Sequence, residues 1–112
     1  MFKVLISDSI SKVAQQIFEK NKVSVDIKTG LSEEEIIKII PDYDSLVVRS
    51  ATKVTKNIIL AGKKLKVIGR AGAGVDNIDV PVAKENNIVR FGLMRKIKLL
   101  KLLIKQNFHT NL

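Results

Sequence analysis

Residues 65–79 combine amino-acid types that bind anions. An apolar run leads into glycines and a single arginine, Arg70, with Gly72, Ala73 and Gly74 close behind it. Glycine lets main-chain amides approach a negative ligand, and the arginine guanidinium adds a fixed cation with planar donors. The segment predicts a site for a small anionic metabolite, although the same glycines would also suit a tight turn between a strand and a helix.

A second cation follows another apolar run. The run that begins at Asp44 predicts a buried strand, and Arg49 and Ser50 come directly after it. Polar groups at the point where a parallel strand leaves its sheet suit a ligand crevice, so Arg49 and Arg70 are expected on one rim, where they would hold a carboxylate and a phosphate. The alternative is that each arginine extends into solvent or pairs with an acid such as Asp44 or Asp76.

Two nucleotide-binding motifs are incomplete in this region. Residues 69–74 have the glycine spacing of a phosphate loop, but Val75 and Asp76 stand where lysine and serine or threonine are needed. A dinucleotide fingerprint would need a third glycine in place of Asn77 and an acid about twenty residues further on. The chain has neither feature, so no nucleotide motif is predicted.

No catalytic residue or metal ligand is predicted either. His109 is the only histidine, and a lone histidine near a terminus is a poor candidate for acid–base chemistry. Asp76 and Asp79 are expected to cap the helix that follows them, because a metal site would need more ligands. The chain has no cysteine, which excludes disulfides and thiolate metal sites and favours the cytoplasm.

Strand and helix patterns alternate along the first 89 residues. Short apolar runs predict buried strands, and apolar residues at helical spacing predict the helices between them. The strands are expected at residues 3–7, 23–27, 44–48 and 65–68 and from 88 onward, and the helices include residues 13–18, 36–40, 58–61 and 80–85. Ser32 with Glu35 predicts a capping box, Thr55 a second cap, and Pro41 a helix end. This alternation predicts an α/β domain with a parallel sheet, in which the strand at 23–27 lies at an edge.

The net charge of +9 is unevenly distributed. Residues 1–88 carry 14 Lys and Arg against all 11 acids, whereas residues 89–112 carry six basic residues and no acid. The few aromatic residues form no stacking surface within a basic field, so nucleic-acid binding is not expected. No apolar span approaches the roughly 18 residues of a membrane helix, and the N-terminal run is too short for a signal peptide. We expect a soluble, cytoplasmic protein.

Three segments carry a resemblance to a known family. Residues 3–8, 44–55 and 65–88 resemble the N-terminal part of the D-isomer-specific 2-hydroxyacid dehydrogenases, in particular their phosphoglycerate-oxidising members. The resemblance covers about residues 3–89 and implies a flavodoxin-like substrate-binding domain with flanking helices, incomplete here, that faces a separate nucleotide-binding domain. It also implies the family's chemistry, in which 3-phosphoglycerate is oxidised with NAD on the way into serine biosynthesis.

The resemblance assigns roles to single residues. Arg49 and Ser50 resemble the family's substrate-side strand end, and Arg70 resembles its second cationic group near the substrate anion. Residues 72–74 match the loop that lies against the substrate carboxylate and the nicotinamide of the cofactor. Ala73 stands where many relatives have threonine or valine, so a hydroxyl contact to the cofactor is absent and main-chain contacts remain.

The resemblance ends near residue 89. The family's glycine-rich dinucleotide loop and its catalytic arginine, glutamate and histidine have no counterpart in residues 90–112. This chain alone is therefore expected neither to bind NAD nor to transfer hydride. Residues 90–112 form a basic tail instead, and the abrupt change of composition favours a gene truncated by a shifted reading frame.

Two other interpretations of the tail stay open. Residues 93–105 place an apolar stripe that includes Leu93, Ile97 and Leu100 opposite several lysines. This pattern predicts a cationic amphipathic helix, which could lie on an anionic membrane or dock on a complete dehydrogenase subunit. The same helix could instead pack on the sheet and replace a missing closing segment. An incomplete domain is also expected to expose apolar surface and to self-associate.

Overall fold

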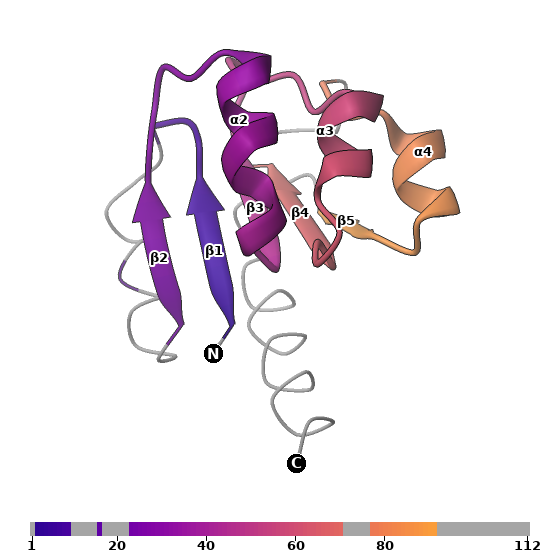
Figure 1. Cartoon of the computed structure of the whole chain (residues 1–112), viewed down its shortest axis with the longest axis horizontal. Coiled ribbons are helices and arrows are strands. Elements are labelled where there is room, and N and C mark those ends of the chain that lie inside the picture. The colour runs from indigo at the N-terminus through magenta and orange to yellow at the C-terminus, as the bar shows by residue number, and fades with distance from the viewer. Residues whose placement is uncertain (1, 10–15, 17–22, 71–76, 92–112) are drawn as a thin grey trace.

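Five parallel strands form one sheet in the computed structural model of this chain, which describes residues 2–9, 16, 23–70 and 77–91 (Figure 1). The strands are β1 (Lys3–Ile6), β2 (Ser24–Ile27), β3 (Ser45–Val48), β4 (Val67–Arg70) and β5 (Val89–Phe91). Their order is β2-β1-β3-β4-β5, and neighbours run parallel. This is the strand order of flavodoxin-like folds. The predicted parallel α/β sheet, with the second strand at an edge, is confirmed.

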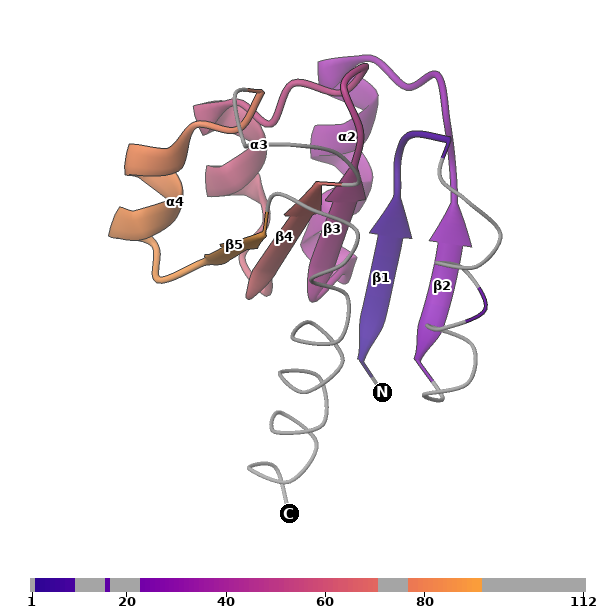
Figure 2. The ribbon, with the colours of Figure 1, turned by 180° about the vertical axis from the view of Figure 1, so that it is seen from behind.

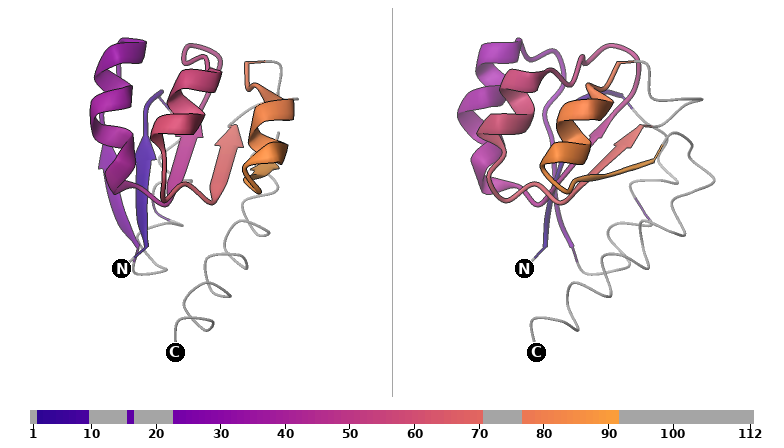
Figure 3. Two further views of the ribbon diagram at one scale, coloured as in Figure 1. Left: turned by 45° about the vertical axis from the view of Figure 1, so that its right-hand side comes forward. Right: turned by 90° about the vertical axis from the view of Figure 1, so that its right-hand side faces the viewer.

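Three helices connect the later strands on one face of the sheet (Figures 2 and 3). They are α2 (Glu33–Ile39), α3 (Lys56–Ala61) and α4 (Val80–Glu85), and the 3-10 turn η1 (Ile40–Asp42) follows α2. From β2 to β5 the chain moves in one direction across the sheet, so right-handed crossovers place all three connections on the same face. The predicted helix at 13–18 lies outside the described residues, apart from Gln16.

Local sequence signals set the ends of these helices. The Ser32 hydroxyl accepts from the Glu35 amide at 3.2 Å, and the Glu35 carboxylate accepts from the Ser32 amide at 3.1 Å. This is the predicted capping box, and it satisfies amides that the first turn of a helix leaves unpaired. Thr55 and Asp79 cap α3 and α4, as predicted. Pro41 lies in η1, so the α-helix ends before it.

β4 lies two residues further along the chain than the prediction. Leu65 is buried like a strand residue, but its amide donates to the Gly62 carbonyl at 3.0 Å in the turn after α3. Apolar periodicity cannot distinguish a buried turn residue from a strand residue. The expectation that Arg70 comes just after the strand is therefore wrong, because Arg70 is the last residue of β4.

The central strands and the helices share one apolar core. Leu5, Leu46 and Ile68 lie in register on β1, β3 and β4, and all three are completely buried. The helices add Ile36, Ile58, Ile59 and Ala83 to this core. Val48 belongs to the same core, and the side chains of Val4, Ile6, Val47 and Val67, which alternate with the core positions along these strands, are buried as well. Strands that are apolar on both sides fit a parallel sheet with cover on each face.

Tyr43 joins η1 to the edge strand β2. Its side chain is buried, and its hydroxyl donates to Asp26 Oδ2 at 2.6 Å. Burial of the side chain is the largest cause that raises the pKa of Tyr43 above its ordinary value of 10.0. The hydrogen bond to Asp26 and the charge of Asp26 raise it further. The folded protein therefore holds the phenolic proton more tightly than the unfolded chain does.

This difference predicts an alkaline loss of stability. A pKa raised by folding stabilises the protein fully below about pH 10, and the contribution declines as the pH rises further. We expect the free energy of unfolding to fall with pH more steeply in the unaltered chain than in Tyr43→Phe, which has no phenolic proton to lose. Urea unfolding between about pH 8 and 11 measures the difference. Equal slopes for the two proteins would contradict the prediction.

Candidate functional site

The carboxyl edge of β3 and β4 carries the predicted cations. Arg49 and Ser50 follow β3 directly and are exposed, and Arg70 ends β4 and is half-buried. Val48 is the Cα partner of Arg70 on the neighbouring strand. Arg49, the next residue, therefore lies one residue beyond the level of Arg70. The structure thus brings both arginines to one edge of the sheet. Gly72, Ala73 and Gly74, predicted with them, lie outside the described residues.

Asp44, one suggested partner for the arginines, lies at the opposite edge. It directly precedes β3, and its carboxylate accepts from the Lys3 amide at 2.9 Å. Arg49, at the other end of the same strand, presents its side chain to solvent. An exposed guanidinium at a strand end is available to a ligand that arrives from solution.

The loop after β3 wraps around a buried carboxylate. Asp8, two residues beyond β1, is 6% exposed. Its Oδ2 accepts from the Arg49 amide at 2.7 Å and from the Thr52 amide at 2.9 Å, and its Oδ1 accepts from the Thr52 hydroxyl at 2.6 Å. Thr52 Oγ1 has one proton and gives it to Asp8, so the Ser7 hydroxyl, 3.0 Å away, donates to Thr52. The amides of Arg49 and Thr52 therefore face Asp8, whereas the Arg49 side chain is exposed.

Asn77 ties this loop to the chain that follows β4. Its side-chain amide donates to the carbonyl of Arg49 at 2.6 Å and to that of Thr52 at 2.5 Å. The main chains are joined next to this contact, because the Val54 amide donates to the Asn77 carbonyl at 2.8 Å and the Asp79 amide to the Val54 carbonyl at 3.0 Å. Residues 49–54 and residues 77–79 are therefore joined by both side-chain and main-chain hydrogen bonds.

Sequence patterns alone do not identify Asp8, Thr52 or Asn77 as parts of this site. In the sequence, Asn77 is notable only because a dinucleotide fingerprint would need glycine there. The available signal is that Asp8 and Thr52 each follow closely after a predicted strand, as Arg49 does. Parallel strands end at a common edge, so polar residues at those ends are candidates to meet.

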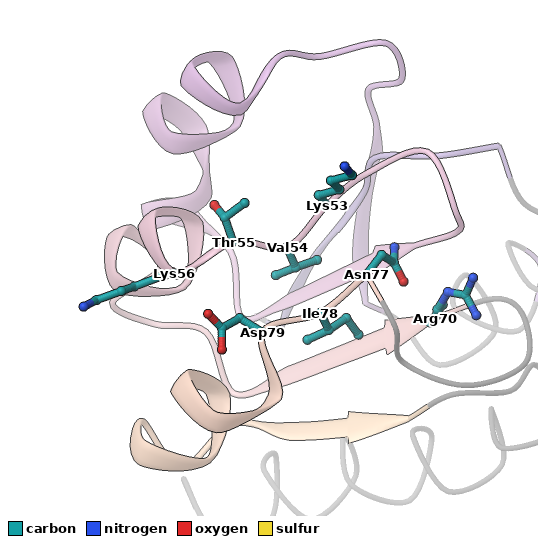
Figure 4. A pocket seen from close by; sticks show the side chains of 8 residues that line it. All are labelled: Lys53, Val54, Thr55, Lys56, Arg70, Asn77, Ile78 and Asp79. Carbon is teal, nitrogen blue, oxygen red and sulfur yellow. The ribbon is translucent and has the colours of Figure 1, made fainter.

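A shallow pocket adjoins Arg70. It has a volume of about 540 Å³, and the described residues that line it are Lys53, Val54, Thr55, Lys56, Arg70, Asn77, Ile78 and Asp79. Figure 4 shows Val54 and Ile78 between the polar side chains, with Arg70 and Lys56 extending in different directions. Arg49 and Ser50 are not among the lining residues. The pocket has a mostly basic rim, with its cations spread apart.

Metal and membrane sites are not found in the part of the chain that the structure describes. No three His, Asp or Glu side chains are grouped there to hold a metal ion. None of the helices within these ranges has the length and apolar character to cross a membrane. The predicted basic helix at 93–105 and His109 lie outside the described residues.

The strand order and the polar loops at the carboxyl edge define the class of this protein. It is a parallel α/β domain of flavodoxin-like strand order, a class of fold in which ligands generally bind outside the carboxyl ends of the strands. The sequence model of the D-isomer specific 2-hydroxyacid dehydrogenase catalytic domain matches residues 4–92. The chain belongs to this family, and the resemblance seen in the sequence is confirmed.

Individual relatives agree with the family match. A D-3-phosphoglycerate dehydrogenase of Synechocystis sp. is 62% identical over 89 residues, which cover 80% of this chain and 16% of the relative. A hydroxypyruvate reductase of Thermotoga maritima is 51% identical over 88 residues, 78% of this chain and 28% of the relative. The solved NAD+-bound 3-phosphoglycerate dehydrogenase of Entamoeba histolytica superposes with a TM-score of 0.72 at 34% identity, covering 80% of this chain and 32% of that one. The chain therefore spans only a small part of these relatives.

Proposed function

We propose that residues 1–89 are the substrate-binding part of a D-2-hydroxyacid dehydrogenase most similar to the phosphoglycerate dehydrogenases. They bind a small anionic 2-hydroxy acid, such as 3-phosphoglycerate, at the edge that carries Arg49 and Arg70. The observation that supports this most is the position of both arginines at the carboxyl ends of adjacent strands, in a chain 62% identical over 89 residues to a D-3-phosphoglycerate dehydrogenase.

Each residue of this edge has a part in the proposed binding. A guanidinium pairs with a carboxylate or phosphate through two parallel N–H···O bonds, so Arg49 and Arg70 hold the two negative groups of the substrate. The Ser50 hydroxyl adds a donor beside Arg49. Residues 72–74, which lie outside the described residues, belong to the proposed site through the family resemblance, which assigns them to the substrate carboxylate and Ala73 also to the cofactor.

The turn after β1 does not fit the pyrophosphate of a dinucleotide. In dinucleotide sites glycine amides at a strand-to-helix turn hold the pyrophosphate. Here β1 is followed by Ser7 and Asp8, and the buried Asp8 carboxylate already binds the amides of Arg49 and Thr52. A pyrophosphate at this turn would meet a like charge at close range and would find those donors in use.

Hydride transfer is therefore not proposed for these 112 residues alone. Oxidation of a 2-hydroxy acid moves the C2 hydride to nicotinamide and the hydroxyl proton to a base. Asp8 is no candidate for the base, because its two oxygens accept three hydrogen bonds from the loop. We propose that these residues act in the cytoplasm together with a complete dehydrogenase subunit that supplies NAD and the base.

Titration of the isotope-labelled chain with 3-phosphoglycerate tests the binding proposal. We expect amide shifts centred on Arg49 to Thr52 and on Arg70, with a Kd of order millimolar. Arg49→Gln and Arg70→Gln should each weaken binding about tenfold or more, because a hydrogen bond to a charged group contributes about 1.5–3 kcal/mol. Lys63→Gln is the matched control, since this exposed cation lies before β4 at the other edge. If Lys63→Gln weakened binding as much as the arginine variants do, the proposed site would be wrong.

A further inference from the structure

Two side chains from outside the arginine loop fix its main chain. We propose that Asp8 and Asn77 are positioning residues of the anion site, which hold residues 49–52 so that Arg49 and Ser50 face the ligand beside Arg70. The inference rests on the function proposed for that edge. Asp8 and Asn77 contact the loop and act on the ligand only through the loop.

Asp8 is suited to this part as a carboxylate and not merely as a polar residue. All its partners are donors, namely the amides of Arg49 and Thr52 and the Thr52 hydroxyl. An asparagine at this position would remove the negative charge that strengthens all three bonds, and its NH2 group would face the Thr52 hydroxyl, which would then have to accept instead of donate. Burying a charged carboxylate is costly unless donors surround it, and here the loop supplies them. The loop and the buried Asp8 therefore stabilise one another.

Asn77 binds the main-chain carbonyls of the same loop. Its amide has two protons, and they go to the carbonyls of Arg49 and Thr52. Both the amide and the carbonyl of each of these two residues are thus bound to Asp8 or Asn77. With the ends of the loop held, Ser50 and Ala51 between them are directed outward, and both are exposed.

The strand register places the two cations side by side, because Val48, the neighbour of Arg49, is the Cα partner of Arg70. The Asn77 contact joins the arginine loop to residues that follow β4. The main-chain bonds between Val54 and the residues around Asn77 reinforce the link. A site whose cations are already in place loses less conformational freedom when the anion binds, so its affinity is higher.

Two near-isosteric variants test the proposal, each with a control of the same chemistry. Asp8→Asn replaces an acceptor, and Asp44→Asn makes the same change where a carboxylate accepts from the Lys3 amide at the amino edge. Asn77→Asp removes two donors, and Asn86→Asp makes the same change where an amide donates to the Val82 carbonyl at 2.8 Å after α4. The full 112-residue chain is used throughout.

We expect Asp8→Asn and Asn77→Asp to weaken 3-phosphoglycerate binding about tenfold, while both controls stay within about twofold of the unaltered chain. Without ligand, hydrogen exchange at the Arg49 and Thr52 amides should become faster in Asp8→Asn and not in Asp44→Asn. Should Asp8→Asn not fold, Thr52→Val and Thr52→Ser replace it. Thr52→Val removes the hydroxyl bond to Asp8 and should weaken binding of 3-phosphoglycerate. Thr52→Ser keeps that bond and should bind 3-phosphoglycerate as the unaltered chain does.

The outcomes separate the two proposals. If the arginine variants abolish binding while Asp8→Asn and Asn77→Asp bind as the unaltered chain does, the positioning role is wrong and the proposed function stands. Faster amide exchange with unchanged affinity would assign the contacts to folding alone and would also overturn the inference. If the unaltered chain binds no 3-phosphoglycerate, the proposed function fails and the inference fails with it.

Discussion

Leu46→Ala is expected to lower the free energy of unfolding by about 3 kcal/mol, within the range for buried leucines. Leu46 is fully buried on the central strand β3, with Leu5 and Ile68 in register on either side. Hydrogen-bonded strands on both sides of β3 limit how far the surroundings can collapse into the space that truncation leaves. Small domains are stable by only about 5–15 kcal/mol, so the variant should unfold at a clearly lower urea concentration.

Leu60→Ala is the matched control for this prediction. The same side chain is shortened, but Leu60 lies on α3 and is 50% exposed. We expect the free energy of unfolding to fall by less than about 1 kcal/mol, because much of the Leu60 side chain stays in contact with water in the folded protein. Urea unfolding of the two variants, followed by circular dichroism, gives both values. If both variants lowered the free energy of unfolding equally, Leu46 and its neighbours Leu5 and Ile68 would not form the centre of the core.

The fold follows from the sequence because its signals are local. Short apolar runs separated by capped helical segments are enough to predict a parallel sheet, and the period-two polarity of the second strand predicts its place at an edge. The capping box of Ser32 and Glu35 depends on residues three apart, so the pattern contains all of it. The apolar pattern places the start of β4 two residues too early, because Leu65 is buried in the core while its amide belongs to a turn.

The site is only partly predictable for the opposite reason. Arg49 is found from the sequence because it follows a strand directly and parallel strands share an edge. The partners that hold it are remote, since Asp8 lies 41 residues away and Asn77 lies 28 residues away. Many polar residues follow strands, and only the register between β1, β3 and β4 decides which of them meet. The roles of Asp8 and Asn77 therefore emerge only when the strands are placed.

The largest expected difference in activity is between a chimaeric enzyme that contains residues 1–89 and the 112-residue chain alone. The Synechocystis D-3-phosphoglycerate dehydrogenase is 62% identical to this chain over 89 residues. We expect residues 1–89 of this chain to replace the matching segment of that relative with kcat/KM kept within about tenfold, because volume-conserving changes between similar cores are tolerated. The 112-residue chain alone should produce no NADH from 3-phosphoglycerate and NAD.

Arg49→Gln in this chimaera should lower kcat/KM by about 10- to 100-fold, since it leaves one negative group of the substrate without its charged partner. Lys63→Gln should stay within about twofold, because this cation lies at the opposite edge of the sheet. NADH absorbance during turnover measures all of these rates. A chimaera that folds but shows no activity would contradict the assignment of residues 1–89 to the substrate side. NADH formation by the 112-residue chain alone would contradict the need for a separate cofactor-binding subunit.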